Sequence, residues 1–88
     1  LQTPDVLVNK IRTRAKAPQV SGITLDGLLE ERARELAWEA WRRNDLIRFG
    51  KFESAWGFKT DANTFHRVYP IPIDELTLNP KLVQNQGY

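Results

Sequence analysis

The first apolar pattern of the chain has the period of an α-helix. Leu7, Ile11 and Ala15 recur every four residues, and Val8 lies beside them on the same stripe. A threonine and a proline precede the pattern, and these residue types suit the N-cap and the first helical position. We therefore predict a helix over residues 4–15.

The second apolar pattern is longer and broader. At about 100° per residue, its apolar side chains fill one wide arc: Leu25, Leu29, Ala33, Leu36, Ala37, Ala40, Trp41 and Ile47. Thr24 suits the N-cap and Gly50 suits the stop, so we predict one long helix over residues 25–49, with a break or bend near Asn44. The first helix is too short to cover an arc this wide, so we expect the long helix to need further partners.

The rest of the chain has no helical or strand period. Residues 51–63 mix aromatic side chains with glycine and predict a loop. Residues 64–88 predict an extended strap, in which Pro70 and Pro72 hold the backbone extended and Asn79 with Pro80 starts a turn. The predicted fold is mainly α: two helices and an irregular extended C-terminal strap, whose apolar side chains dock on helices, some of them outside this chain.

Composition limits the chain to one small domain with an ordinary globular content. It has 88 residues, with 13 basic and 11 acidic side chains and no cysteine. It therefore has neither disulfides nor thiolate metal ligands, and we expect no metal site and no cofactor. No apolar run reaches the roughly 20 residues of a membrane span. The chain also lacks methionine, so we expect it to be a fragment of a longer protein.

Four cations crowd the second half of the first predicted helix: Lys10, Arg12, Arg14 and Lys16. Cations near a helix C-terminus are favoured by the helix dipole, which makes a solvated face one interpretation. The other interpretation is a phosphate-binding patch, and it gives an alternative function, a small basic helical domain that binds nucleic acid.

A second group of charges borders the apolar arc of the long predicted helix. Its members predict a structural ion network: Glu31, Arg32, Glu35, Glu39, Arg42, Arg43, Asp45 and Arg48. If this border is dry, removing Glu39 should cost about 3–5 kcal/mol. Glu35 and Glu39 also have the spacing of an acid–base pair, but the nearby arginines should keep both ionised. We expect no catalytic residue.

The loop and strap offer little further chemistry. His66 has no second histidine or cysteine to help it bind zinc. Trp56 and Phe58 lie in the predicted loop, and their rings have the chemistry to stack on a sugar. They are the only two candidates for ligand contact.

Three motifs in order resemble the SusD/RagB family. The stretch from Val8 to Ala15 is similar to one family helix, with its Ile-Arg-x-Arg-Ala. The next helix of the family has matching positions at Glu31, Arg32, Glu35, Leu36, Glu39, Arg42 or Arg43, Asp45, Leu46 and Arg48. The ending is similar at Pro70, Ile71, Pro72, Glu75, Leu76, Asn79, Pro80, Gln84, Asn85, Gly87 and Tyr88. The chain departs from the family at Lys16, where glycine is usual, and at Gln86, where proline is common.

The resemblance implies that residues 1–88 are the C-terminal segment of a much longer all-helical, tetratricopeptide-repeat-containing protein. Family members are lipoproteins on the cell-surface face of the outer membrane of Gram-negative bacteria. They bind oligosaccharides or other nutrients and partner a SusC-like TonB-dependent transporter, and they are not enzymes. The lipid anchor would lie upstream. Family ligand contacts lie mostly upstream too, so the resemblance carries no binding residue to this segment.

Overall fold

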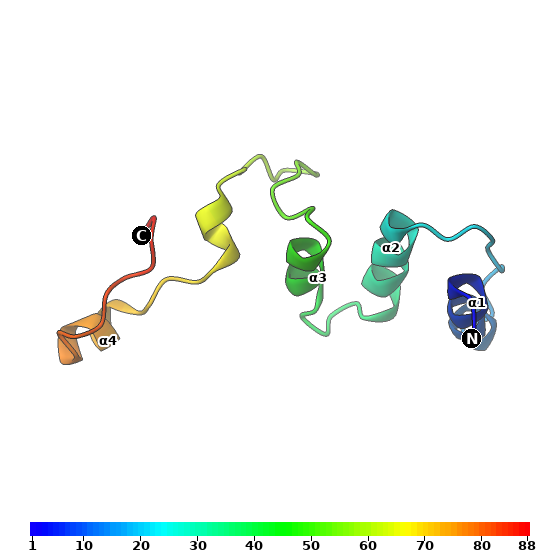
Figure 1. The fold of residues 1–88 in the computed structure, drawn as a ribbon, viewed down its shortest axis with the longest axis horizontal. Helices are drawn as coiled ribbons and strands as arrows, with labels where there is room; N and C mark the ends of the chain where they lie inside the picture. Colours follow the sequence, from blue (N-terminus) through cyan, green and yellow to red (C-terminus); the bar gives the residue numbers. More distant parts are fainter. The chain divides into compact units, whose positions relative to one another are not determined.

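A computed structural model describes all 88 residues as two compact units, Leu1–Lys51 and Phe52–Tyr88. We call them the N-terminal unit and the C-terminal unit and describe each by itself. The helices are α1 (Pro4–Arg14), α2 (Leu25–Glu35), α3 (Arg42–Arg48), a 3₁₀ helix (Thr64–Arg67) and α4 (Ile73–Leu78) (Figure 1). No strand forms, so the prediction of a mainly α fold is confirmed. None of these helices is long and apolar enough to cross a lipid bilayer.

Helix α1 begins and ends as capping rules require. The Thr3 side chain accepts a hydrogen bond from the Val6 N–H at 3.4 Å, and Pro4 is the first helical residue. At the other end, the N–H of Lys16 binds the Thr13 carbonyl and the next N–H binds the Arg12 carbonyl. This is a Schellman motif, in which the residue after the cap takes a positive φ. Lys16 has φ +55°, so it takes the conformation for which glycine is favoured.

The single helix predicted over residues 25–49 is two helices. Helix α2 begins at the Thr24 cap and ends at Glu35, and α3 begins only at Arg42. Between them Trp38 and Ala40 have φ values of +68° and +61°, which a right-handed helix cannot contain. No glycine or proline marks this break, so hydrophobic periodicity alone could not reveal it.

The core of the N-terminal unit is small and takes one residue from each helix. Val8 of α1, Leu29 of α2 and Leu46 of α3 are buried. Gly50 ends α3 with φ +68° in a second Schellman motif, as the sequence predicted. Half of the apolar arc predicted for the long helix is exposed: Leu25, Ala37, Ala40 and Trp41. The last three follow Glu35, where the break ends the helical register.

The C-terminal unit contains two short helices that the sequence did not predict. Residues 64–67 form the 3₁₀ helix and Ile73–Leu78 form α4, both within the segment predicted as an extended strap. Acidic residues in its first turn favour the N-terminus of α4. Asn79 leaves the helical region (φ −128°, ψ 95°) because a residue that precedes proline is pushed towards extended conformations. No residue of this unit is fully buried.

Candidate functional site

The most buried acid of the N-terminal unit lies on α3. Asp45 is 2% exposed and accepts two hydrogen bonds from Arg32 of α2, at 2.7 Å from Nε and 3.1 Å from Nη2. Arg48, one turn further along α3, lies 3.8 Å from the same carboxylate. The hydrogen bond to Asp45 raises the pKa of Arg32 above its ordinary value. The paired charges join α2 to α3 across the break.

A second buried acid joins α2 to α1. Glu31 is 8% exposed, and its Oε2 accepts hydrogen bonds at 2.7 Å from both Arg12 and Arg34. The bond from Arg34, assisted by the bond from Arg12, lowers the pKa of Glu31, against the opposing effect of burial. The sequence placed Glu31 in the network but did not indicate Arg12 as its partner.

The remaining members of the predicted network are placed differently from one another. Glu35 pairs with Arg14 of α1, and Arg42 donates to Glu30 at 2.8 Å and to the Leu29 carbonyl at 3.2 Å. Glu39 follows the end of α2 and is exposed, while Arg43 is partly buried on α3. The charges therefore pair mainly between helices, instead of forming one line along a single helix. Glu39 is exposed, so the condition of a dry border is not met at this residue.

These pairs also use part of the predicted basic patch. Arg12 and Arg14 are bound to glutamates of α2, and the Lys10 ammonium donates to the Gln2 side chain at 2.9 Å. The interpretation as a solvated face is incomplete, because Arg12 has only 16% of its side chain exposed. Two of the four cations of the predicted phosphate-binding patch, Arg12 and Arg14, are therefore already neutralised by glutamates.

Polar side chains of α1 hold the loop that leads to α2. The Asp5 carboxylate accepts from the Gly22 and Ile23 N–H groups, both at 2.8 Å, and these bonds, Ile23 first, lower the pKa of Asp5. Asn9 donates to the Val20 carbonyl at 2.8 Å and accepts from its N–H at 2.9 Å. Sequence reasoning indicated neither of these contacts. The spacing of four between Asp5 and Asn9 was the available signal.

The two ligand-contact candidates lie on a tight turn in the C-terminal unit. Trp56 and Lys59 exchange backbone hydrogen bonds at 3.1 and 2.8 Å, and Gly57 supplies the positive φ (+51°) of the first central position. Trp56 is 59% exposed and Phe58 is fully exposed. The Lys59 ammonium donates to the Asp61 carbonyl at 2.6 Å and lies 5.3 Å from the centre of the Phe52 ring. The contacts of Lys59 with Asp61 and Phe52 therefore hold the turn, and the turn exposes the rings of Trp56 and Phe58 to solvent.

Two acids on either side of this turn, Glu53 and Asp61, bind residues of the 3₁₀ helix. Glu53 accepts two bonds from Arg67, at 2.5 and 2.9 Å, and this pairing lowers the pKa of Glu53. Asp61 accepts from the N–H of Asn63, which is the main cause of its lowered pKa, and also contacts His66. His66 thus has a local partner, as a loop residue of this kind is expected to have.

The end of the strap folds back on the segment that precedes it. The Gln84 amide pairs with both backbone groups of Ile71, at 2.8 and 2.9 Å, in the manner of a neighbouring strand. Asn85 donates to the Tyr69 carbonyl at 2.8 Å, and the Tyr88 hydroxyl donates to the Val68 carbonyl at 2.8 Å. We call this set of bonds the amide clasp.

The aromatic end of the strap depends on one glycine. The Tyr88 ring meets Phe65 edge-on with centroids 5.3 Å apart. Gly87 has φ +99°, and a Cβ added there would lie 2.4 Å from Phe65 Cγ, so only glycine fits. Pro70 and Pro72 flank the clasped Ile71, while Asn79 and Pro80 end α4, so the predicted strap residues occupy two separate places.

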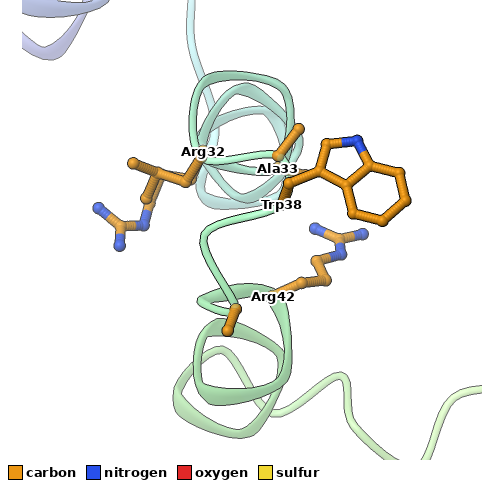
Figure 2. Close-up of a pocket in the computed structure, with 7 residues that line it drawn as sticks. Arg32, Ala33, Trp38 and Arg42 are labelled. Carbon is orange, nitrogen blue, oxygen red and sulfur yellow. The ribbon is translucent and has the colours of Figure 1, made fainter.

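A pocket of about 420 Å³ lies beside the break between α2 and α3. Its lining residues are the apolar Ala33, Leu36, Ala37, Trp38 and Ala40 and the charged Arg32 and Arg42. Figure 2 shows the Trp38 indole and the Arg42 guanidinium on the same side of the chain, with Arg32 directed away from them. Trp38 falls within the helix predicted over residues 25–49, and the sequence gave no sign of this pocket. No group of three metal-ligating side chains exists in the chain.

The comparisons with known proteins agree with one another. The sequence model described as the SusD family matches residues 2–68. The chain is 35% identical, over 91 aligned positions, to the starch-binding protein SusD of Bacteroides thetaiotaomicron, and the alignment covers 92% of this chain and 16% of that protein. It is 37% identical over 101 positions to SusD-like protein P25 of Formosa agariphila, with 92% and 19% covered. The chain therefore spans less than a fifth of the length of these relatives.

Proposed function

The chain belongs to the SusD family, and from this premise we propose that it is the C-terminal segment of a cell-surface protein that binds a glycan. The protein would lie on the outer face of the outer membrane of a Gram-negative bacterium, held by a lipid anchor upstream. It would deliver its ligand to a SusC-like TonB-dependent transporter and would not be an enzyme.

One observation carries this proposal: the chain matches a protein named for starch binding at 35% identity across 92% of its own residues. The geometry agrees with a supporting role for this segment. The buried acids Glu31 and Asp45 are each bound by arginines, as in structural ion pairs that join helices. The hydrogen bonds from Arg34 and Arg12 lower the pKa of Glu31, which does not suit a proton donor. The function of these two acids is to join the three helices of the N-terminal unit.

Calorimetric titration of the full-length protein with malto-oligosaccharides and other soluble glycans tests the binding. We expect saturable binding whose affinity changes less than about twofold between 50 and 200 mM salt, because sugar contacts release few ions. A tagged full-length protein should also co-purify with a TonB-dependent β-barrel from detergent-solubilised outer membranes. Absence of both results would refute the proposal.

The aromatic turn is the part of this segment that we propose for ligand contact. Trp56 and Phe58 present their rings to solvent from a braced turn, a suitable geometry for stacking against a sugar. Substituting both by alanine should weaken glycan affinity at least tenfold without changing the melting temperature. Unchanged affinity would remove both residues, and Phe52→Ala is not a suitable control because Lys59 contacts that ring.

The alternative, a basic helical domain that binds nucleic acid, predicts a different salt response. Four phosphate contacts would lower the affinity about 100-fold over the same change in salt. The glutamates of α2 already neutralise two of the four cations on which this alternative depends, Arg12 and Arg14. The titrations above therefore separate the two functions.

A further inference from the structure

The pocket at the break between α2 and α3 lies beside the most exposed tryptophan of the chain. Trp38 is 104% exposed, and its neighbour Trp41 is 46% exposed. Trp38, the three alanines and Leu36 line the pocket and form one apolar surface, which we call the Trp38 surface. Large indoles are rarely left in water, so this surface needs an occupant.

The backbone under the Trp38 surface gives a second, independent sign. Trp38 and Ala40 hold positive φ values that cost free energy for residues other than glycine. Such conformations persist only where surrounding contacts enforce them. Within the turn, the Glu39 N–H bonds to the Leu36 carbonyl at 3.1 Å, but both strained residues remain exposed. Contacts from outside the N-terminal unit would hold Trp38 and Ala40 in these strained conformations.

The chemistry of the pocket favours an apolar occupant over a sugar. A sugar site needs several convergent polar groups, whereas this pocket has no amide, carboxylate or hydroxyl side chain among its lining residues. Its only charged side chains are two arginines, and both are already paired: Arg32 with Asp45, and Arg42 with Glu30. An apolar side chain can therefore enter without leaving a charge unpaired.

We propose that the Trp38 surface is the docking site for an amphipathic helix from the part of the same polypeptide that lies outside these 88 residues. The relatives supply the argument for this occupant, since this chain corresponds to only 16% and 19% of their lengths. The all-helical fold of the chain makes helix-in-groove packing the natural mode of contact. The inference uses one part of the proposed function, that the chain belongs to a longer protein, and does not depend on the glycan.

Oxidative footprinting of the native full-length protein tests whether the surface is covered. Trp38 should be oxidised at least tenfold more slowly than in the denatured protein, without glycan and at every protein concentration. Oxidation at the denatured rate would overturn the proposal. Protection that appears only with added malto-oligosaccharide would assign a ligand site instead, and protection only at high protein concentration would assign a second copy.

Photo-crosslinking then identifies the occupant. Replacing Trp38 by p-benzoyl-phenylalanine in the full-length protein should give a crosslink to a peptide of the same polypeptide outside these 88 residues. A crosslink to residues 52–88, to a second copy, or to no protein segment would overturn the proposal. The same replacement at Phe58 is the matched control, because Phe58 is equally exposed and lies on the turn proposed for ligand contact. Glycan titration of both variants distinguishes failure of this inference from failure of the proposed function.

Discussion

In the N-terminal unit the buried acids bind arginines and join helices, whereas in the C-terminal unit amide side chains hold the end of the strap by binding the backbone. Asp45 and Glu31 are buried ions, each bound by at least one arginine. Gln84 and Asn85 are neutral groups, of which the first is partly exposed and the second exposed. A buried charge that loses its partner is far more costly than a neutral group that can turn to water. The two units should therefore respond differently to loss of a single side chain.

The two units also differ in how many apolar side chains they bury. Apolar burial in the N-terminal unit is limited to Val8, Leu29 and Leu46, and no residue in the C-terminal unit is buried. The C-terminal unit nevertheless has one point of close contact, where Gly87 meets the Phe65 ring. Sensitivity to added volume should be concentrated at that point.

The largest expected effect is on the buried acid of α3. Asp45→Ala should lower the free energy of unfolding of the full-length protein by about 3 kcal/mol, because the partly buried Arg32 loses two hydrogen bonds to its buried partner. Urea unfolding followed by circular dichroism measures it. The control is Glu39→Ala, an exposed acid whose loss should cost less than about 1 kcal/mol. Equal losses would show that burial does not distinguish the two acids.

The next effect tests the close contact in the C-terminal unit. Gly87→Ala should cost about 2–3 kcal/mol, because the new Cβ meets Phe65 and the positive φ becomes strained. Gly57→Ala is the matched control, since Gly57 also has a positive φ but has no atom within 4 Å of an added Cβ. It should cost only the backbone strain, about 1 kcal/mol. If both substitutions cost the same, the Phe65 contact does not matter.

A smaller effect is expected for the amide clasp. Gln84→Ala should cost about 1–2 kcal/mol, because two hydrogen bonds to Ile71 are lost at a site that is only partly buried. The exposed Gln86→Ala serves as control and should be neutral. Hydrogen exchange at the Ile71 amide gives a local measure, and unchanged protection there would contradict the clasp.

A gain of stability is expected at the end of α1. Lys16→Gly should stabilise by about 0.5–1 kcal/mol, because glycine takes φ +55° without strain, although its unfolded state is more flexible. Gly50 already occupies the equivalent position of α3, and Gly50→Lys should destabilise by a similar amount. A loss of stability in Lys16→Gly would argue against the Schellman geometry.

The smallest effect is on the slope of stability with pH. The pKa of Glu31 is lower in the folded protein than its ordinary value of 4.5. Its stabilisation is therefore fully present above about pH 4.5 and is lost as the pH falls through the folded-state pKa. The melting temperature should fall less steeply below that pH in Glu31→Gln than in the unsubstituted protein. Parallel curves for the two proteins would contradict this assignment.

Local rules determined much of this protein from its sequence. The mainly α class, the helix starts at Thr3 and Thr24, and the stop at Gly50 follow from side chains that act within one helical turn. The membership of the SusD family also followed from ordered motifs along the chain. These features need no information about distant residues, so the sequence alone was sufficient.

Only the tertiary structure decided which groups meet. The partner of Arg32 is thirteen residues away on another helix, and the partner of Glu31 on α1 is nineteen residues away. The amide clasp at Gln84 also depends on where the chain path brings a distant backbone group, that of Ile71. Helical periodicity extends only along one element, and a charge or an amide pairs with whatever the fold places within about 3 Å of it.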